Sequence, residues 1–360
     1  MTLHLVYEKA WVPSTRIRLH QLVPRLEAAG WRCQVAPYPR GAAARSRFAA
    51  GLEAADLVLV HRARPTRRET SWWDRLPVPI VYDFDDAIMW GRRRGLRGLL
   101  QRRRRGAGFR RMLRVCDGVS CGNAFLAQAC EGRAAPVAVV PSAVRADVPQ
   151  AQHSDAPPLR IGWVGRRGNL AALGALAPSL ERVAAARDVE LVVVSDGSLT
   201  LPGVRVLHHP WSLADEAQQI AHFDVGVMPL DLRDPWSRGK CAYKLLQYMA
   251  AGVAALGSDV GMNADLIRHG ENGLLAREPA DWERSLLRLA DDPALRRRLG
   301  RAGRETVLGG YTIEAVGDQL ATFLRDVSRA AGQSSGSVRS TAASTSKAAA
   351  RARSAPRAGD

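Results

Sequence analysis

The chain has 360 residues and 46% hydrophobic content, enough for two domains with packed cores. No apolar run approaches the roughly 20 residues of a membrane span, and the N-terminus lacks a basic segment followed by an apolar one, so we expect a cytoplasmic protein. The net charge of +17 predicts an anionic partner, and five cysteines without disulfide or zinc spacing fit a reducing cytoplasm. The histidines show no HExxH-like grouping, so no structural metal is predicted, and no cofactor is expected.

Strands and helices alternate through residues 1–148. Strands are expected at 3–7, 33–36, 56–60, 80–82, 117–121 and 137–140. A helix is expected from Arg16 to Ala29, with Gly30 ending it. This alternation is typical of a doubly wound parallel sheet, which is an α/β fold resembling the Rossmann domain.

A second series of the same kind follows a proline-rich segment. Residues 149–158 contain three prolines and are predicted to be an interdomain linker. Strands are then expected at 159–164, 189–194, 204–207, 224–230 and 253–256 within a domain of residues 159–310. A helix is expected at 311–331, and the Ser-, Ala- and Arg-rich residues 332–360 are predicted to be disordered.

Two lysines carry the strongest functional signal. Lys240 and Lys244 lie at the start of a helix expected from Lys240 to Ala251. Cations at a helix N-terminus oppose the helix dipole, and loops before helices at the carboxyl edge of a parallel sheet collect anions. A bound diphosphate explains both lysines.

The stretch around these lysines resembles the nucleotide-sugar half of B-fold (GT-B) glycosyltransferases, the retaining family four or group 1. The shared elements are Phe223–Gly226 with Pro229, Gln247–Gly252, Val260–Gly261, Asp265 and Gly270–Leu274. The resemblance implies two facing Rossmann-like domains with a cleft between them, and a late helix that crosses back onto the first domain. It also implies metal-independent, retaining transfer of a sugar from a nucleoside diphosphate. Where the family often has two glutamates, this chain has Gly239 and Gln247, and Lys240 and Lys244 are expected to bind phosphate instead.

The resemblance implies further donor contacts at the ends of strands in the second domain. They are Gly165, Arg166, Asn169, Asp196, Gly197, Trp211, Gly261, Asn263 and Asp265. Several have a structural alternative: the glycines form turns, Trp211 packs in the core, and Asn263 or Asp265 serves the start of a helix.

The run Asp83-Phe84-Asp85-Asp86 ends a buried strand in the first domain and has several interpretations. It fits the metal-binding DxD of A-fold transferases, the nucleophile motif of a phosphatase family, or an acceptor-domain run of the B-fold family. In the last case Asp85 or Asp86 orients the acceptor hydroxyl with His61, while Arg16, Arg18, Arg62 and Asp83 lie on the acceptor side. The structural alternative is a buried network that joins these carboxylates to the arginines.

Residues Arg92 to Arg114 contain eleven arginines and no acid. Leucines and Phe109 partly share one helical face, and a face of this kind suits an anionic membrane surface. The alternative is a solvated arginine-rich helix. The sequence therefore predicts a glycosyltransferase for a glycan or lipid-linked acceptor, in polysaccharide or glycolipid synthesis, peripheral at the inner membrane face. No nucleic-acid partner is expected. A metal-dependent enzyme that uses Asp83 and Asp85, and a non-catalytic basic binding protein, remain the alternatives.

Overall fold

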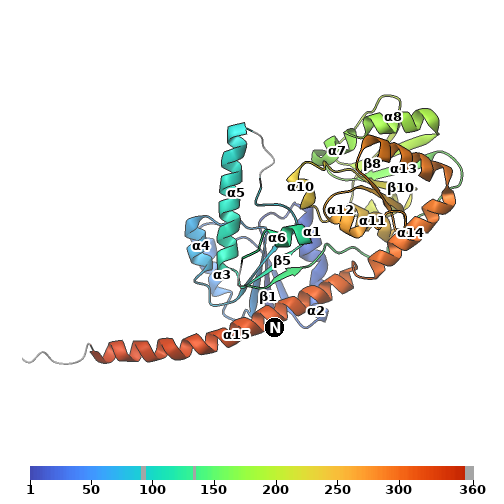
Figure 1. Cartoon of the computed structure of the whole chain (residues 1–360). Coiled ribbons are helices and arrows are strands. Elements are labelled where there is room, and N and C mark those ends of the chain that lie inside the picture. Colours follow the sequence, from blue (N-terminus) through green and yellow to red (C-terminus); the bar gives the residue numbers. More distant parts are fainter. Residues whose placement is uncertain (91–94, 133–134, 353–360) are drawn as a thin grey trace, which may run out of the picture.

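The computed structural model describes residues 1–90, 95–132 and 135–352. These residues form two α/β units that face each other, with helix α10 between them (Figure 1). Each unit is built on a parallel sheet of six strands, so the predicted α/β class with two doubly wound domains is confirmed.

The first sheet has the order β2-β1-β3-β4-β5-β6, and every neighbouring pair is parallel. Its strands are β1 (Thr2–Tyr7), β2 (Arg32–Pro37), β3 (Leu57–His61), β4 (Ile80–Phe84), β5 (Gly118–Cys121) and β6 (Val137–Val139). The central strands β3 and β4 are buried along their whole length, as apolar runs covered on both faces must be.

The second sheet has the order β12-β11-β10-β7-β8-β9 and is also parallel throughout. Its strands are β7 (Leu159–Val164), β8 (Val189–Ser195), β9 (Arg205–Pro210), β10 (Val225–Met228), β11 (Ala254–Ser258) and β12 (Leu274–Ala276). In both sheets the first strand in sequence has later strands on either side, and the strand order reverses next to it. Ligands bind at the carboxyl ends of strands at such switch points.

Helices cover both faces of each sheet. In the first unit they are α1 (Pro13–Arg18), α2 (Val23–Ala28), α3 (Ala42–Ala50), α4 (Arg67–Trp73), α5 (Gly95–Val115) and α6 (Ala124–Gln128). In the second they are α7 (Leu170–Gly174), α8 (Ala177–Ala186), α9 (Glu216–Ala221), α10 (Pro235–Arg238), α11 (Tyr243–Ala250), α12 (Met262–Leu266), α13 (Pro279–Asp291) and α14 (Pro293–Leu308). Helix α5 projects from the first unit (Figure 1). None of the helices in the described ranges has both the length and the apolar character needed to cross a bilayer.

The single helix expected from Arg16 to Ala29 is wrong. The segment instead forms α1, a short 3-10 turn at His20–Leu22, and α2. Pro24 lies in the first turn of α2, where its missing N–H is tolerated, but inside a longer helix its ring would clash with the carbonyl of the preceding turn. The sequence therefore breaks the helix before this proline.

Helix α15 (Ile313–Ala352) returns to the first unit, where Val316, Leu320 and Leu324 are buried against the sheet. Arg25 of α2 holds it through a double ion pair to Asp318, at 2.7 and 2.6 Å. The helix continues past residue 331 to Ala352, in contrast to the disorder expected from Gly332, and residues 353–360 of that tail lie outside the described residues. Alanine, arginine and lysine favour helix, and no proline occurs before Pro356.

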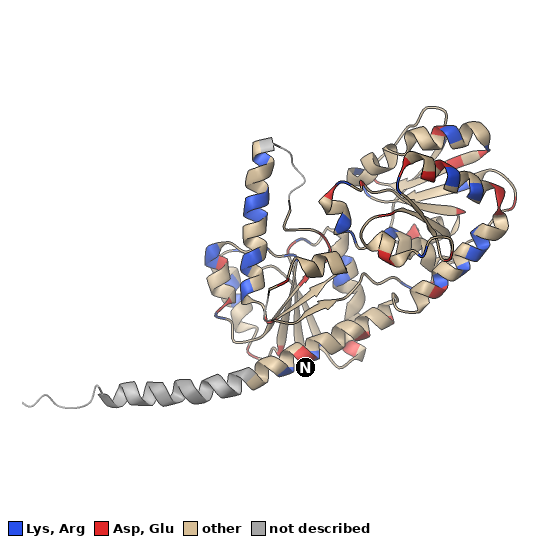
Figure 2. Cartoon of the chain, viewed as in Figure 1, with Lys and Arg blue, Asp and Glu red and all other residues tan. Residues whose placement is uncertain are grey.

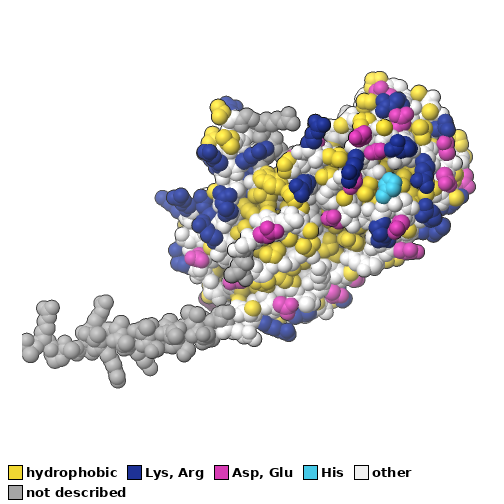
Figure 3. Space-filling view, viewed as in Figure 1, with side chains coloured by type: hydrophobic (Ala, Val, Ile, Leu, Met, Phe, Trp, Pro, Cys, Tyr) yellow, Lys and Arg dark blue, Asp and Glu magenta, His cyan; other side chains and the backbone are white. Residues whose placement is uncertain are grey.

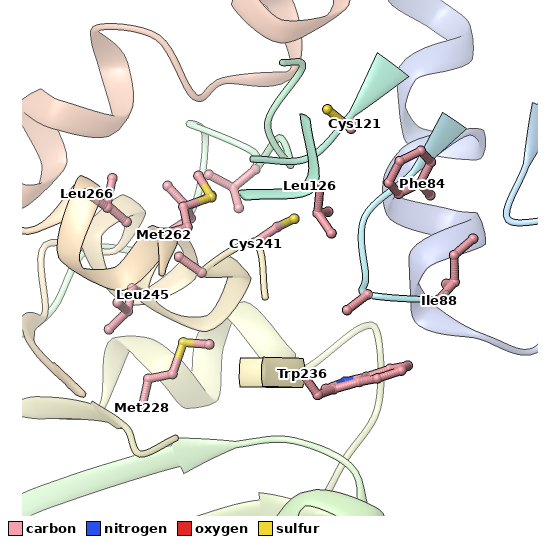
Figure 4. Packing of buried hydrophobic residues seen from close by; sticks show 14 of the residues in the cluster. Phe84, Ile88, Cys121, Leu126, Met228, Trp236, Cys241, Leu245, Met262 and Leu266 are labelled. Carbon is pink, nitrogen blue, oxygen red and sulfur yellow. The ribbon is translucent and has the colours of Figure 1, made fainter. Parts of the chain in front are cut away.

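Apolar side chains from both units form one continuous cluster. Phe84, Ile88 and Leu126 of the first unit belong to the same cluster as Trp236 and Cys241 of the second (Figure 4). The sulfur of Cys241 lies 3.1 Å from the carbonyl oxygen of Asp85. The two units therefore touch closely at this point.

Candidate active site between the two domains

The segments that follow β3 and β4 meet the segment that precedes α11 at the junction of the units. The Nη1 of Arg62, after β3, lies 3.0 Å from Asp85 Oδ1 and 3.3 Å from Asp86 Oδ2. The Nζ of Lys240, from the second unit, lies 2.9 Å from Asp86 Oδ1. Two carboxylates and two cations therefore alternate across the interface.

Asp86 is ionised in this setting. Burial alone would raise its pKa, but the charges of Lys240 and Arg62 lower it below the ordinary aspartate value. Arg62 reaches both carboxylates with its backbone in the left-handed region, at φ 60°. Such a conformation is strained for a residue other than glycine and is found preferentially at functional sites.

Asp83 has no exposed oxygen and belongs to a buried network. Arg18 of α1 donates to both of its oxygens, and His61 Nδ1 lies 2.7 Å from Asp83 Oδ2. All three side chains are 1–2% exposed. Burial would raise the pKa of Asp83, but the charge of Arg18 and the hydrogen bond from His61 lower it. Asp83 and Arg18 therefore lie where the structural alternative puts them, away from an acceptor.

The contact with Asp83 defines the orientation of His61. A carboxylate only accepts hydrogen bonds, so His61 carries its proton on Nδ1. In this tautomer Nε2 can accept a hydrogen bond, and it lies 3.3 Å from the Ser14 hydroxyl, which itself accepts from Arg62 Nη1. His61 also lines a cavity on the first-unit side of the interface. His61 is thus the member of the buried network that reaches the site.

Lys244 lies in the first turn of α11, which begins at Tyr243 and not at Lys240 as predicted. The delay follows from Ala242, whose left-handed backbone (φ 49°) cannot belong to a right-handed helix. The Lys244 ammonium lies 5.5 Å from the centroid of the Trp163 ring. Among the described residues, no carboxylate pairs with it.

Gly165, at the end of β7, lies against the same lysine. A Cβ at this glycine would lie 2.6 Å from the Trp163 ring and 3.0 Å from Lys244 Cε. The neighbouring turn, which contains Arg166 and Asn169, is held by Asp196, because the Asp196 carboxylate accepts from the backbone N–H of Arg167. A Cβ at Gly197 would meet the Arg167 side chain at 2.8 Å. Arg166 is exposed at this edge.

Arg16, on the first unit, lies close to Glu216 and Trp211 of the second unit. It is 3.9 Å from Glu216, and Glu216 accepts a 2.7 Å hydrogen bond from the indole of Trp211. Trp211 is 41% exposed, so the core-packing alternative is wrong for this residue. No signal in the sequence singled out Glu216.

The remaining predicted donor residues lie at the start of α12 or within it. Asn263 is completely buried without a hydrogen-bond partner in the described part of the chain, and it does not cap α12. Gly261 lies against the backbone of Arg238, where a Cβ would meet the Arg238 carbonyl oxygen at 2.7 Å. Asp265 is exposed in the first turn of α12.

The sequence and the fold were compared with those of known proteins. The family described as "Glycosyl transferases group 1" matches residues 158–292. Residues 158–292 thus form a group 1 glycosyltransferase domain, and the chain has the GT-B fold. The predicted family and enzyme class are thus confirmed. No curated protein sequence matches this glycosyltransferase.

Solved structures share its fold at low sequence identity. Sucrose-phosphate synthase from Thermosynechococcus elongatus has a TM-score of 0.69 and 15% identity, covering 92% of this chain and 100% of that chain. HepE from Anabaena, in complex with UDP and glucose, has a TM-score of 0.67 and 14% identity, covering 91% and 100%. A TarM variant from S. aureus, in complex with Fondaparinux, alpha-GlcNAc-glycerol and UDP, has a TM-score of 0.57 and 12% identity, covering 78% and 59%.

One of the two departures from the family glutamate pair, Gly239, lies in a tight contact. A Cβ at Gly239 would lie 2.8 Å from the Cβ of Ala87 and 2.9 Å from its backbone nitrogen. No side chain fits there while the two units are in this contact. Gln247 occupies the second glutamate place and is half-buried in α11.

Proposed function

We propose that this glycosyltransferase moves a sugar from a nucleoside-diphosphate sugar to a glycan or lipid-linked acceptor, with retention at the anomeric carbon and without a metal. The observation that carries the proposal is the position of Lys240 and Lys244 where the strand ends of both units meet. Structural neighbours support the donor class, because HepE was solved with UDP-glucose and UDP.

In the proposed mechanism the leaving diphosphate develops negative charge on its oxygens. Lys240, Lys244 and Arg166 stabilise this charge, as fixed cations in a partly dry site do. The backbone turn held by Asp196 and the glycines Gly165 and Gly197 allow the phosphates to approach. In this mechanism Trp211 and Asp265 contact the nucleoside of the donor. Gly261 and Asn263, at the start of α12, also contact the donor.

Acceptor activation is assigned to the first unit. Lys240 is bound to Asp86, so a diphosphate that attracts Lys240 leaves an Asp86 oxygen to accept from the acceptor hydroxyl. Arg62 holds Asp85 and Asp86 in place through ion pairs, and its charge helps to lower the pKa of Asp86. His61 Nε2 is the second acceptor at this site, and Asp83 acts only by positioning His61, with Arg18 holding Asp83.

We also propose that the enzyme acts in surface polysaccharide or glycolipid synthesis at the cytoplasmic face of a membrane. Leu96, Leu99 and Leu100 of α5 are 83%, 49% and 57% exposed. Arginines follow them along the same projecting helix (Figure 2). Basic and apolar side chains on one exposed helix suit an anionic lipid surface.

A panel of UDP-, GDP- and ADP-sugars, with thermal unfolding as the readout, tests the donor assignment. The matching nucleotide sugar at 100 times its dissociation constant should add about 2.7 kcal/mol to the free energy of unfolding. The double variant Lys240→Ala/Lys244→Ala should lose this stabilisation. The control Arg182→Ala/Arg187→Ala removes the same charge from exposed positions in α8 and directly after it. In this control the stabilisation should remain.

Two outcomes would favour the alternatives. If no nucleotide or nucleotide sugar stabilises the wild type, the protein is a binding module on this fold. If chelator abolishes sugar transfer, a metal bound through Asp83 and Asp85 is required, and the assignment of these residues to arginine-held networks is overturned.

A further inference from the structure

A cavity of about 420 Å³ lies beside the candidate acceptor groups and has no assigned ligand. It is lined by the loop after β1, the end of β3 and the residues after it, helix α5, and Trp236 of α10 in the second unit. His61, whose Nε2 faces the acceptor site, is among its lining residues. A molecule in this cavity therefore reaches the groups that would accept the proton of an acceptor hydroxyl.

The cavity is strongly cationic. Lys9, Arg62, Arg64 and Arg105 line it, against the single carboxylate of Glu8. Within the described part of the chain, the ion pairs of these groups add two cations (Arg40, Lys240) and two carboxylates (Asp85, Asp86), so a surplus of three positive charges remains among those residues. An anion bound among these side chains would lower their mutual repulsion.

The cations come from separate elements that the fold brings together. Arg64 is held 3.1 Å from Glu8, and α5 packs tightly on its backbone, since a Cβ at Gly108 would lie 2.8 Å from Arg64 Cβ. Arg105 donates from α5 to the Trp90 carbonyl oxygen at 3.2 Å. The guanidinium groups of Arg64 and Arg105 are therefore held in place before a ligand binds. A guanidinium held in this way can donate two hydrogen bonds to the oxygens of one phosphate group.

Gln101, one turn before Arg105 on α5, provides a neutral contact in the same cavity. Its Oε1 is buried and has no hydrogen-bond partner among the described residues. A buried acceptor without a partner costs about 1–3 kcal/mol. The donor that would satisfy it is a ligand hydroxyl, as a sugar carries.

We propose that this cavity binds a phosphate or diphosphate ester carried by the acceptor, so that the enzyme glycosylates a phosphorylated acceptor. The inference rests on the proposed transferase function and extends it to the acceptor class. A carboxylate would neutralise only one of the three surplus charges, whereas a diphosphate ester carries two to three. A phosphate group of this kind belongs either to a lipid carrier or to a soluble sugar phosphate.

Calorimetric titration in the presence of saturating UDP tests the cavity separately from the donor site. The probes are geranyl diphosphate, inorganic diphosphate and geraniol. We expect wild type to bind the two diphosphates and not geraniol. Arg64→Gln and Arg105→Gln should each raise the dissociation constant about tenfold or more, the size of a lost hydrogen bond to a charged group. Arg103→Gln is the matched control, since Arg103 is exposed on the same helix.

The outcomes separate this inference from the proposed function. Binding of both diphosphates supports the site with a soluble or lipid source, and binding of geranyl diphosphate alone supports it with a lipid source. If UDP binds and neither diphosphate does, or if Arg105→Gln behaves as Arg103→Gln, the inference is overturned while the transferase assignment stands. If UDP itself does not bind, the proposed function fails first. Unchanged UDP affinity and melting temperature in each variant exclude misfolding.

Discussion

At the scale of single residues, Lys244 has the most informative environment. Its ammonium lies over the Trp163 ring without a carboxylate partner in the described part of the chain. Burial, together with the charge of Lys240, lowers its pKa to about 8. A cation kept in such a place is stabilised when an anion binds.

The pH dependence of donor use should report this lysine. Below pH 8 Lys244 is protonated and can bind the diphosphate, and above it the ammonium is lost. We therefore expect kcat/KM for the donor to fall as pH rises through about 8. In Lys244→Arg the fall should move to higher pH, because a guanidinium stays charged. A wild-type profile that is flat from pH 7 to 9.5 would contradict the diphosphate role, and Lys244→Met should lower kcat/KM without this transition.

The sequence indicated the lysines and the aspartate run, but it did not show that Asp83 lies in a buried network while Asp85 and Asp86 lie at the interface between the units. Asp83 is inside β4, where it pairs in register with His61, and its side chain points into the network with Arg18. Asp85 and Asp86 lie just past the strand end and face the second unit. A shift of one residue reverses the facing of a strand side chain, so the assignment depends on where β4 stops.

At the scale of elements, strands were predicted more accurately than helix boundaries. Long buried apolar runs such as Leu159–Val164 identify central strands without further information. The start of α11 depends on the left-handed backbone of Ala242. Alanine does not favour that conformation. The sequence near Ala242 therefore does not predict where α11 begins.

Helix α15 should divide into a part that the fold needs and a part that it does not. A chain that ends at Tyr311 loses the buried side chains of Val316, Leu320, Leu324 and Val327. At about 1.5–3 kcal/mol each, these contacts rival the whole stability of a domain, so this chain should not fold. A chain that ends at Ala331 keeps them, and its melting temperature and transfer to a soluble acceptor should match wild type. A large loss in the longer chain would show that residues 332–360 contribute to the fold.

At the scale of the whole molecule, the contact between the two units decides what the site can be. It forces glycine at 122 and 239, because a Cβ at Gly122 would lie 2.2 Å from the sulfur of Cys241 and one at Gly239 would meet Ala87. These contacts join loops that carry no periodic pattern. Two domains were therefore predictable from the sequence, but their close junction and the cationic cavity beside it were not.

The exposed half of α5 gives the whole molecule a surface for membrane attachment. Arginines and exposed leucines lie on the same projecting helix (Figure 3). Residues 92–94 of the arginine-rich segment lie outside the described residues. Each basic side chain near an anionic bilayer contributes about 1 kcal/mol, an effect that salt screens over roughly 8–10 Å.

Changing Arg102, Arg103 and Arg104 to glutamine, with Arg105 left in its cavity, should therefore weaken binding to phosphatidylserine-containing vesicles by at least tenfold in a sedimentation assay. UDP affinity should not change. The control Arg182→Gln/Arg187→Gln/Arg205→Gln removes the same charge from the second unit, where these arginines form exposed ion pairs of little energetic value. If wild type ignores anionic vesicles at low salt, or if both triple variants lose binding equally, α5 is not a membrane contact. In the first of these cases the phosphorylated acceptor would be a soluble molecule, because an enzyme with no affinity for the membrane surface does not reach a lipid carrier there.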